Sequence, residues 1–116
     1  MTTTVSKSKG IGDKTCTMYL SEHVCILYDK LNRPIEVQLT ATEWKIMEVL
    51  LKNMNHVVSY TQLTLMVWGP DYLEVSGRPL AHWHVKNLRD LIMHRTGRSE
   101  SPIQTVRGFG YKWKVR

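Results

Sequence analysis

Three neighbouring side chains, Lys86, Asn87 and Arg89, have the chemistry needed to contact a DNA duplex. Lysine and arginine neutralise phosphates or donate hydrogen bonds to guanine, and asparagine pairs in a bidentate manner with adenine. If the segment is helical, one side of it carries five residues, with Trp83 and Asn87 beside them: His82, Lys86, Arg89, Asp90 and Met93. Taken alone, this side is also compatible with an ordinary solvated helix face.

A second set of cationic side chains lies in the last fourteen residues, I-Q-T-V-R-G-F-G-Y-K-W-K-V-R. Two β-prone runs flank the glycines of segment 108–110, which predicts a hairpin with a tight turn. Arg107 lies beside the turn, and Lys112, Lys114 and Arg116 alternate along the return strand. A basic hairpin after a basic helix suits a duplex, with the helix in the major groove and the ribbon against the backbone or minor groove. Lys112 is therefore a candidate for backbone contact, although a hairpin alone could simply have a solvated charged edge.

The charge of the chain is divided unevenly along its 116 residues. Residues 1–77 contain seven Lys and Arg against eight Asp and Glu, a net charge of −1, whereas residues 78–116 contain nine against two, a net charge of +7. This concentration of positive charge predicts a polyanionic partner, and the backbone of double-stranded DNA is the usual one. A membrane surface would instead require a basic helix with a broad exposed apolar face. Here the apolar stripe is needed for a core, so we favour DNA.

The helix that must position the first group of residues is predicted over residues 79–94. Its apolar residues fall within about 60° of one another at 100° per residue and form a stripe predicted to be buried: Ala81, Val85, Leu88 and Ile92. Pro79 suits the first helical turn, where its missing N–H costs nothing. The preceding segment, 69–79, is rich in turn residues and contains two prolines, so it is predicted to be a loop.

Two capping boxes predict two further helices. Thr40 and Glu43 begin a helix that extends to about residue 53, and Ser59 and Gln62 begin one that ends near residue 68. The apolar residues predicted to face the core are Trp44, Met47, Leu50 and Leu51 in the first helix and Leu63, Met66 and Val67 in the second. Trp44 is interpreted as a core residue rather than a platform for a cofactor.

Three β-prone runs, 15–20, 24–28 and 35–39, precede the first helix and predict a small antiparallel sheet. Residues 1–13 contain almost nothing to bury, so we expect a flexible tail or the remnant of a linker, followed by a single domain over 14–116. An N-terminal antiparallel β-sheet, three helices and a C-terminal β-hairpin wing, in that order, predict the α+β class and a winged helix-turn-helix fold.

Other kinds of chemistry have little support in the sequence. Cys16 and Cys25 lie in β-prone runs without CxxC spacing, so two buried thiols are favoured over a disulfide bridge. His82 and His84 are about 200° apart on a helix, which does not suit a shared metal ion. No Ser or Cys nucleophile has a recognisable base, and the glycines at 108–110 precede no helix that could bind a phosphate. We therefore expect no catalytic site, metal or cofactor.

The sequence also carries no sign of a membrane span. No apolar run approaches the ~20 residues needed to cross a bilayer. The first ten residues, M-T-T-T-V-S-K-S-K-G, lack the apolar core of a signal peptide. We therefore expect a cytoplasmic protein.

Five ordered motifs resemble those of the OmpR/PhoB-type winged-helix domain, the DNA-binding output module of bacterial two-component response regulators. They are L-T-A-T-E-W (39–44), V-V-S-Y-T-Q-L (57–63), V-W-G (67–69), H-V-K-N-L-R (84–89) and I-Q-T-V-R-G-F-G-Y (103–111). The match covers roughly residues 14–116, and the last motif is highly specific in this order and spacing. The resemblance implies a four-stranded N-terminal sheet, three helices and a wing, with the third helix in the major groove.

The resemblance also implies roles for individual residues. His84, Lys86, Arg89 and Thr105 match family positions that contact phosphates, and Arg107 matches the wing arginine that reaches the minor groove. In the family, the loop before the third helix can touch RNA polymerase. The candidates for that contact are Pro70, Asp71, Tyr72, Leu73 and Glu74.

The base-reading positions depart from the family pattern. Where the family usually has R-T-V-D-V-H-I-x-R-L-R, this chain has P-L-A-H-W-H-V-K-N-L-R over residues 79–89. An acidic base contact has become His82, a basic one has become Asn87, and an arginine has become Pro79. The candidates for base contact are therefore His82, Asn87 and Lys86, and the operator sequences of other family members do not transfer to this chain.

The resemblance implies partners as well. Family members bind direct repeats head-to-tail, and a preceding receiver domain normally supplies dimerisation, so we expect this domain alone to be mainly monomeric. Two alternatives stay open: a stand-alone regulator, and a winged helix used for protein interaction with reduced DNA binding. The retained Lys86, Arg89 and Arg107 argue against the second alternative.

Overall fold

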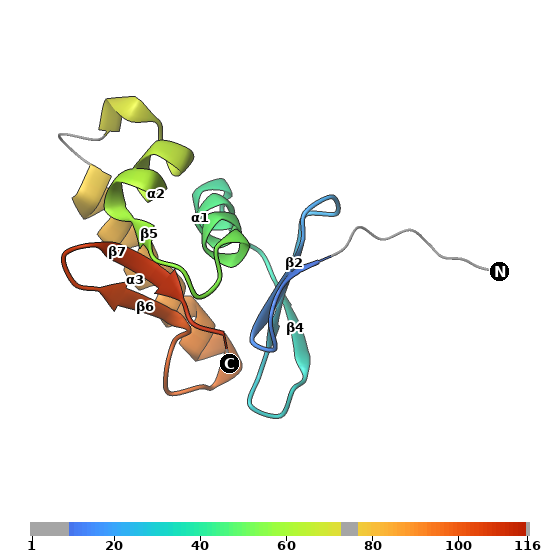
Figure 1. The fold of residues 1–116 in the computed structure, drawn as a ribbon. Helices are drawn as coiled ribbons and strands as arrows, with labels where there is room; N and C mark the ends of the chain where they lie inside the picture. The colour runs from blue at the N-terminus through green and yellow to red at the C-terminus, as the bar shows by residue number, and fades with distance from the viewer. Residues whose placement is uncertain (1–9, 73–76, 116) are drawn as a thin grey trace.

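The chain folds into two antiparallel sheets with three α-helices between them (Figure 1). The computed structural model describes residues 10–72 and 77–115. The elements in order are β1 (Ile11–Gly12), β2 (Cys16–Tyr19), β3 (Val24–Tyr28), β4 (Pro34–Val37), α1 (Ala41–Lys52), β5 (Val58–Ser59), α2 (Tyr60–Val67), the 3-10 helix η1 (Pro70–Tyr72), α3 (Gly77–Thr96), β6 (Ile103–Val106) and β7 (Gly110–Trp113). The arrangement confirms the predicted α+β winged-helix fold.

The N-terminal sheet is a meander in the order β1-β2-β3-β4, so the four strands implied by the resemblance are confirmed. The prediction that residues 1–13 form a flexible tail is wrong for residues 11–13. Ile11 pairs with Met18 and Gly12 with Thr17, and the turn that follows is fixed by Asp13. Strand β1 has only two residues, and its single apolar side chain, Ile11, is half-buried. Such a strand has too weak a hydrophobic pattern to be recognised in a sequence. Residues 1–9 lie outside the described part of the chain.

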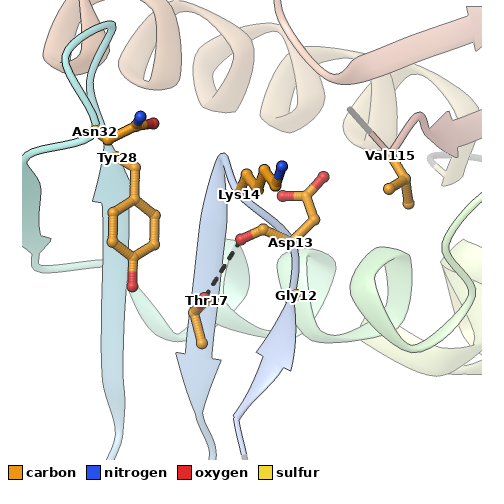
Figure 2. Close-up of a pocket in the computed structure, with 7 residues that line it drawn as sticks. All are labelled: Gly12, Asp13, Lys14, Thr17, Tyr28, Asn32 and Val115. Atoms are coloured by element: carbon orange, nitrogen blue, oxygen red, sulfur yellow. Dashed lines mark hydrogen bonds between the residues drawn. The ribbon is translucent and has the colours of Figure 1, made fainter.

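Asp13 connects this sheet to the other end of the chain. Its Oδ1 accepts hydrogen bonds from the backbone N–H groups of Thr15, at 2.8 Å, and Cys16, at 3.1 Å. Its Oδ2 accepts one from the indole Nε1 of Trp113, at 3.1 Å. Figure 2 shows Asp13 in the β1–β2 turn, where its carbonyl oxygen also accepts a hydrogen bond from the hydroxyl of Thr17. One carboxylate therefore satisfies both a tight turn and a buried indole N–H.

The inner face of the N-terminal sheet is apolar. Alternation along β2 and β3 buries Cys16, Met18, Cys25 and Leu27 against the helices. Both cysteines are free, with their Sγ atoms 3.6 Å apart. The predicted pair of buried thiols is therefore confirmed.

The first two helices begin at the predicted capping boxes. Thr40 Oγ1 accepts from the Glu43 N–H at 3.1 Å, and Glu43 Oε1 accepts from the Thr40 N–H at 2.9 Å. Ser59 and Gln62 make the equivalent pair of bonds at the start of α2. The inward residues are largely as predicted, but Met66 is wrong: it is 52% exposed, and Thr64 is buried instead. In a helix as short as α2, packing against α1 and α3 decides which residues face inward.

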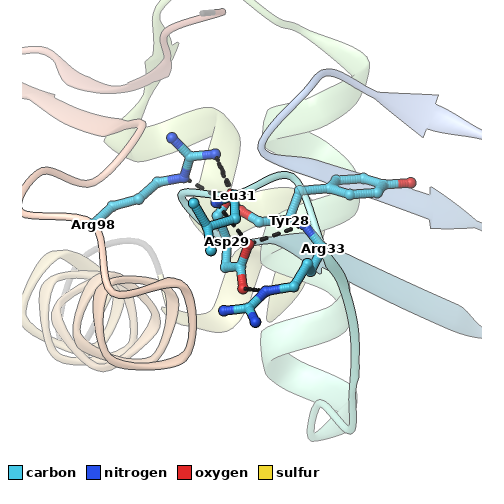
Figure 3. Close-up of polar contacts among 5 residues, drawn as sticks. All are labelled: Tyr28, Asp29, Leu31, Arg33 and Arg98. Atoms are coloured by element: carbon cyan, nitrogen blue, oxygen red, sulfur yellow. Dashed lines mark hydrogen bonds and ion pairs between the residues drawn. The ribbon is translucent and has the colours of Figure 1, made fainter.

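The turn between β3 and β4 is fastened to the end of α3 (Figure 3). Arg98 donates from Nη2 to the carbonyl oxygens of Tyr28, at 3.2 Å, and Asp29, at 3.0 Å. The Asp29 carboxylate accepts from the backbone N–H groups of Leu31 and Arg33, both at 2.9 Å, and from Arg33 Nε at 2.8 Å. These bonds lower the pKa of Asp29, with the Arg33 backbone N–H as the largest cause. Arg98, one of the nine cationic residues of segment 78–116, thus serves the fold.

The C-terminal sheet, here called the wing sheet, has the order β5-β7-β6. The predicted hairpin is confirmed, with Ile103 opposite Trp113 and Val106 opposite Gly110. A third strand, β5, pairs with β7 on its other side. The turn is made by Arg107 and Gly108, closed by a 2.9 Å bond from the Phe109 N–H to the Val106 carbonyl.

The two wing glycines have different tasks. Gly108 has φ +83°, the left-handed conformation that glycine adopts without strain. Gly110 lies in β7 rather than in the turn, which corrects the prediction that it allows the chain to turn. A side chain there would meet the β5 backbone, 2.9 Å from Val58 C and 2.8 Å from Ser59 Cα. Gly110 is needed because β5 approaches so closely.

Candidate nucleic-acid interface

Helix α3 buries the stripe predicted for it. Ala81, Val85 and Leu88 are fully buried and Ile92 is 1% exposed, so the helix is anchored along its length. The helix is longer than predicted: it begins at Gly77 and ends at Thr96. Pro79 lies within its first turn, as expected. A helix held on one side in this way presents the opposite side as a firm surface.

The side of α3 that faces away from the core is formed by four residues at helical spacing: Trp83, Lys86, Asn87 and Asp90. Trp83 and Asp90 lie about 170° from the middle of the buried stripe at 3.6 residues per turn. Lys86 and Asp90 are exposed and form an ion pair at 3.4 Å, while Asn87 is half-buried. This outer stripe combines donors, an acceptor and an apolar ring, which suits the edges of bases.

Arg89 faces the wing rather than the outer stripe. Its Nε donates to the carbonyl oxygen of Ile103 at 3.0 Å, and its Nη2 donates to the hydroxyl of Thr105. Its guanidinium also lies 5.7 Å from the centre of the Tyr111 ring. The structure therefore brings together two of the predicted phosphate contacts, Arg89 and Thr105, and gives Arg89 a second task of joining α3 to the wing.

His82 lies on the same side of α3 as Arg89. Its Nδ1 is 3.4 Å from the hydroxyl of Tyr111, a fully buried residue of β7. The imidazole itself is exposed. This candidate for base contact is thus fixed on one edge by the wing sheet and open on the other.

His84 lies on the opposite flank of α3, against the end of α2. Its ring is 5.5 Å from the Trp68 ring and 4.8 Å, edge to face, from the Trp83 ring. His84 is half-buried. The predicted phosphate contacts are therefore divided, with Arg89 and Thr105 on the wing side and His84 on the α2 side.

The tip of the wing carries Arg107 and Phe109, both exposed, and Phe109 is 67% exposed. The Phe109 carbonyl accepts from the Tyr60 N–H at 3.0 Å, which ties the tip to the start of α2. Lys112 pairs with Gln104 and so lies on the opposite face of the wing sheet from Tyr111 and α3. The structure thus separates Lys112 from the Arg89–Thr105 pair.

The predicted polymerase-contact loop is described only in part. Pro70, Asp71 and Tyr72 form η1 and are exposed at the end of α2. Leu73 and Glu74 lie outside the described residues.

Two aromatic residues stand out that the sequence analysis did not place among the candidates. Trp83 is 59% exposed at the centre of the outer stripe, and Phe109 is exposed at the wing tip. The signal for Trp83 was present in the sequence, since its spacing to Lys86, Asn87 and Asp90 repeats the helical period. No comparable pattern marks a single residue in a turn.

Within residues 10–72 and 77–115, no group of three or more His, Cys, Asp or Glu could hold a metal ion. None of the described helices is both long and apolar enough to cross a membrane. An open hollow lies between the N-terminal sheet and Val115, lined by Asp13, Lys14 and Tyr28 among others (Figure 2). Its lining residues come from neither α3 nor the wing tip.

Residues 18–113 match the family described as "Transcriptional regulatory protein, C terminal". The chain belongs to this family. Its members are DNA-binding domains that regulate transcription, and the family is not a class of enzymes. The OmpR/PhoB resemblance seen in the sequence is thereby confirmed.

Two curated relatives are regulatory proteins of enterococci. The chain is 33% identical over 93 residues to the regulatory protein VanR of Enterococcus faecium. The aligned region covers 80% of this chain and 37% of VanR. It is 37% identical over 92 residues to the regulatory protein VanRc of Enterococcus gallinarum, covering 79% of this chain and 36% of VanRc. The chain therefore spans little more than a third of the length of these relatives.

The fold is also that of a domain solved on DNA. The DNA-binding domain of RstA from Klebsiella pneumoniae, in complex with the RstA box, matches with a TM-score of 0.72. The match covers 91% of this chain and 97% of that domain, at 18% sequence identity. At this identity the likeness supports the winged-helix fold alone.

Proposed function

We propose that this domain is the output domain of a cytoplasmic two-component response regulator and binds specific sites on double-stranded DNA. In this proposal α3 enters the major groove with its outer stripe, and the tip of the wing lies at the minor groove. The observation that carries the proposal is the anchored helix α3, whose outward side holds Lys86 and Asn87 and whose flank holds Arg89 toward the wing. Arg107 adds a cation at the wing tip. Membership of the family supports it.

The roles divide between base reading and backbone contact. Asn87 reads bases from the outer stripe, and His82 does so from the flank of α3 that faces the wing. Lys86 contributes a phosphate contact or a base contact from the same stripe. Arg89 and Thr105 present a joint donor group to one phosphate, since Arg89 keeps guanidinium N–H groups beyond those bound to Ile103 and Thr105.

The remaining candidates extend the footprint. His84 contacts a phosphate on the α2 side, and Arg107 inserts into the minor groove beside the exposed Phe109. Lys112 reaches a phosphate only from the other face of the wing sheet, so we expect it to contribute least. The domain proper comprises the folded chain from residue 11 onward.

Assembly and partners follow from the family. We propose that two copies bind a direct repeat head-to-tail, that a receiver domain in the parent protein supplies dimerisation, and that the isolated domain is monomeric. Pro70, Asp71 and Tyr72 form an exposed corner at the end of α2, which supports a contact with RNA polymerase through this loop.

The test is the dependence of binding on salt. A duplex pool enriched by binding-site selection is titrated with the domain from about 50 to 200 mM salt. We expect log K to fall linearly with log salt, with a slope of roughly −0.9 for each phosphate neutralised, and so about −4 for four cationic contacts. If the selection enriches no sequence and binding does not change with salt, the proposal is contradicted and a protein-interaction module is favoured instead. Equal binding to an acidic polypeptide would also contradict it.

A further inference from the structure

The wing sheet fixes which nitrogen of His82 faces outward. Nδ1 lies 3.4 Å from the hydroxyl of Tyr111, and Tyr111 is fully buried. The two nitrogens of an imidazole lie on different edges of the ring. Since Nδ1 is turned toward the buried hydroxyl and the His82 side chain is exposed, Nε2 is the nitrogen on the open side.

The same contact favours one placement of the imidazole proton. A phenol is a weak acid and a good donor, whereas the unprotonated nitrogen of a neutral imidazole is a stronger acceptor than a phenol oxygen. The favoured arrangement has Tyr111 donating its hydroxyl proton to Nδ1 and the ring proton of neutral His82 on Nε2. If the imidazole gains a second proton, Nε2 still carries one. His82 thus presents an N–H donor to the open side in both of its charge states.

The charged surroundings of His82 agree with this donor role. The Arg89 guanidinium lies over the Tyr111 ring, and Lys86 follows one turn along α3, where it pairs with Asp90. No carboxylate bonds to His82 among the contacts of the described residues, so nothing there competes for its Nε2–H. The wing-side flank of α3 is therefore a donor surface.

We infer that His82 selects a guanine by donating from Nε2 to the N7 atom of that base. The inference rests on the proposed entry of α3 into the major groove. There guanine offers two neighbouring acceptors, N7 and O6, whereas adenine places an amino donor beside N7 and cytosine offers only an amino donor. A donor fixed in place favours guanine and is repelled by cytosine. A carboxylate at this position would have the opposite preference, because it accepts from the cytosine amino group.

The experiment combines a change in the protein with a change of one atom in the DNA. The preferred duplex is obtained by binding-site selection, and each guanine in it is replaced in turn by 7-deazaguanine, which has a carbon in place of N7. We expect one guanine per half-site at which this replacement weakens binding by about 2- to 10-fold, the value of one hydrogen bond. With His82→Ala the penalty at that guanine should disappear. If no 7-deazaguanine penalty depends on His82, the inference is wrong.

Two further variants test the direction of the hydrogen bond. His82→Asp should move the selected base at that position from guanine to cytosine and leave the other positions unchanged. Tyr111→Phe keeps the ring that packs beside Arg89 but removes the hydroxyl that orients His82, so the 7-deazaguanine penalty should shrink while the melting temperature changes by only a few degrees. An unchanged base preference in His82→Asp would overturn the inference.

A matched control is available on the same helix. His94 is exposed on α3, about 18 Å further along at 1.5 Å per residue. His94→Ala should leave the penalty at the chosen guanine intact, and loss of that penalty in this control would contradict the role of His82. If the wild-type domain binds no duplex, the proposed function fails as well. If it binds duplexes without any N7 dependence, the proposed function stands and only the inference about His82 fails.

Discussion

The close approach of β5 to Gly110 makes a sharp prediction about stability. Gly110→Ala would place a new methyl group 2.8 Å from Ser59 Cα and 2.9 Å from Val58 C. Carbon atoms pack best about 3.5–4.0 Å apart, so relieving the contact with Ser59 Cα alone would need β5 and β7 to separate by roughly 0.7 Å. The carbonyl oxygen of Val58 lies closer still to the new methyl group and would require a larger separation. The obstacle is backbone, which has no rotamer to change. Relief therefore requires the β5–β7 pairing at Ser59 and Gly110 to open.

The cost can be assembled from its parts. Overpacking of this kind costs about 1–3 kcal/mol, and each strained or broken backbone hydrogen bond adds about 0.5–1.5 kcal/mol. We expect Gly110→Ala to lower the free energy of unfolding by about 3–5 kcal/mol, a large part of the total for a domain of this size. Tyr111, fully buried beside it, would be displaced with the strand.

Gly108→Ala is the matched control. It adds the same methyl group two residues away, at φ +83°, with nothing within 4 Å. Only the left-handed backbone conformation is penalised, at about 1–2 kcal/mol. Urea unfolding of the wild type and both variants, followed by tryptophan fluorescence and circular dichroism, measures the difference.

Two results would refute this reasoning. The first is a loss of stability for Gly110→Ala no greater than that for Gly108→Ala, because the close approach of β5 would then be unimportant. The second is full rescue of Gly110→Ala by Val58→Ala. The clash is with the main chain, so shortening the Val58 side chain should not relieve it.

Three other predictions concern charged and polar side chains. Arg107→Ala should lose more affinity on duplexes with A·T-rich flanks than on G·C-rich ones, with nearly unchanged melting, and an equal loss would reduce Arg107 to a phosphate contact. Asn87→Ala should cost about 1–3 kcal/mol on the preferred site and flatten one base position, whereas Lys86→Ala should weaken all sequences alike and lower the salt slope by about one; site selection on both variants would expose a reversal of these roles. The folded pKa of Asp29 lies below its ordinary value, so its contribution to stability is present above about pH 4 and is lost as the pH falls through the folded pKa. Asp29→Asn should accordingly flatten the acid branch of a plot of unfolding free energy against pH, and an unchanged acid branch would show that the bonds to Arg33 contribute nothing there.

Much of the fold could be predicted from the sequence because its signals are local. The capping boxes at Thr40 and Ser59 specify helix starts within four residues, and the stripe through Val85 specifies which side of α3 is buried. The β6–β7 hairpin likewise depends on neighbouring residues. The motif order was enough to indicate the family. Strand β1 was not predicted because its two residues show no recognisable hydrophobic pattern. The exposure of Met66 was not predicted because α2 has only about two turns, too few to specify its buried side.

The candidate site shows where sequence reasoning stops. Periodicity placed Lys86, Asn87 and Arg89 on the polar side of one helix; the structure places Lys86 and Asn87 on the outer stripe but turns Arg89 toward the wing. Periodicity could not show that Arg89 turns back to Thr105, sixteen residues away, while Lys86 stays on the outer stripe. That division depends on where β6 packs against α3, and no residue within α3 encodes the position of β6.

The sequence by itself determined most of the elements, the buried side of α3, and the excess of positive charge in the last third of the chain. Only the tertiary structure decided how that charge is used. Arg98 donates hydrogen bonds to the carbonyl groups of Tyr28 and Asp29, about seventy residues away. His82 is oriented by the buried hydroxyl of Tyr111 in β7. The physical reason is that a pattern along the chain specifies which way a side chain points from its own element. What it meets there depends on the packing of elements that are distant in sequence.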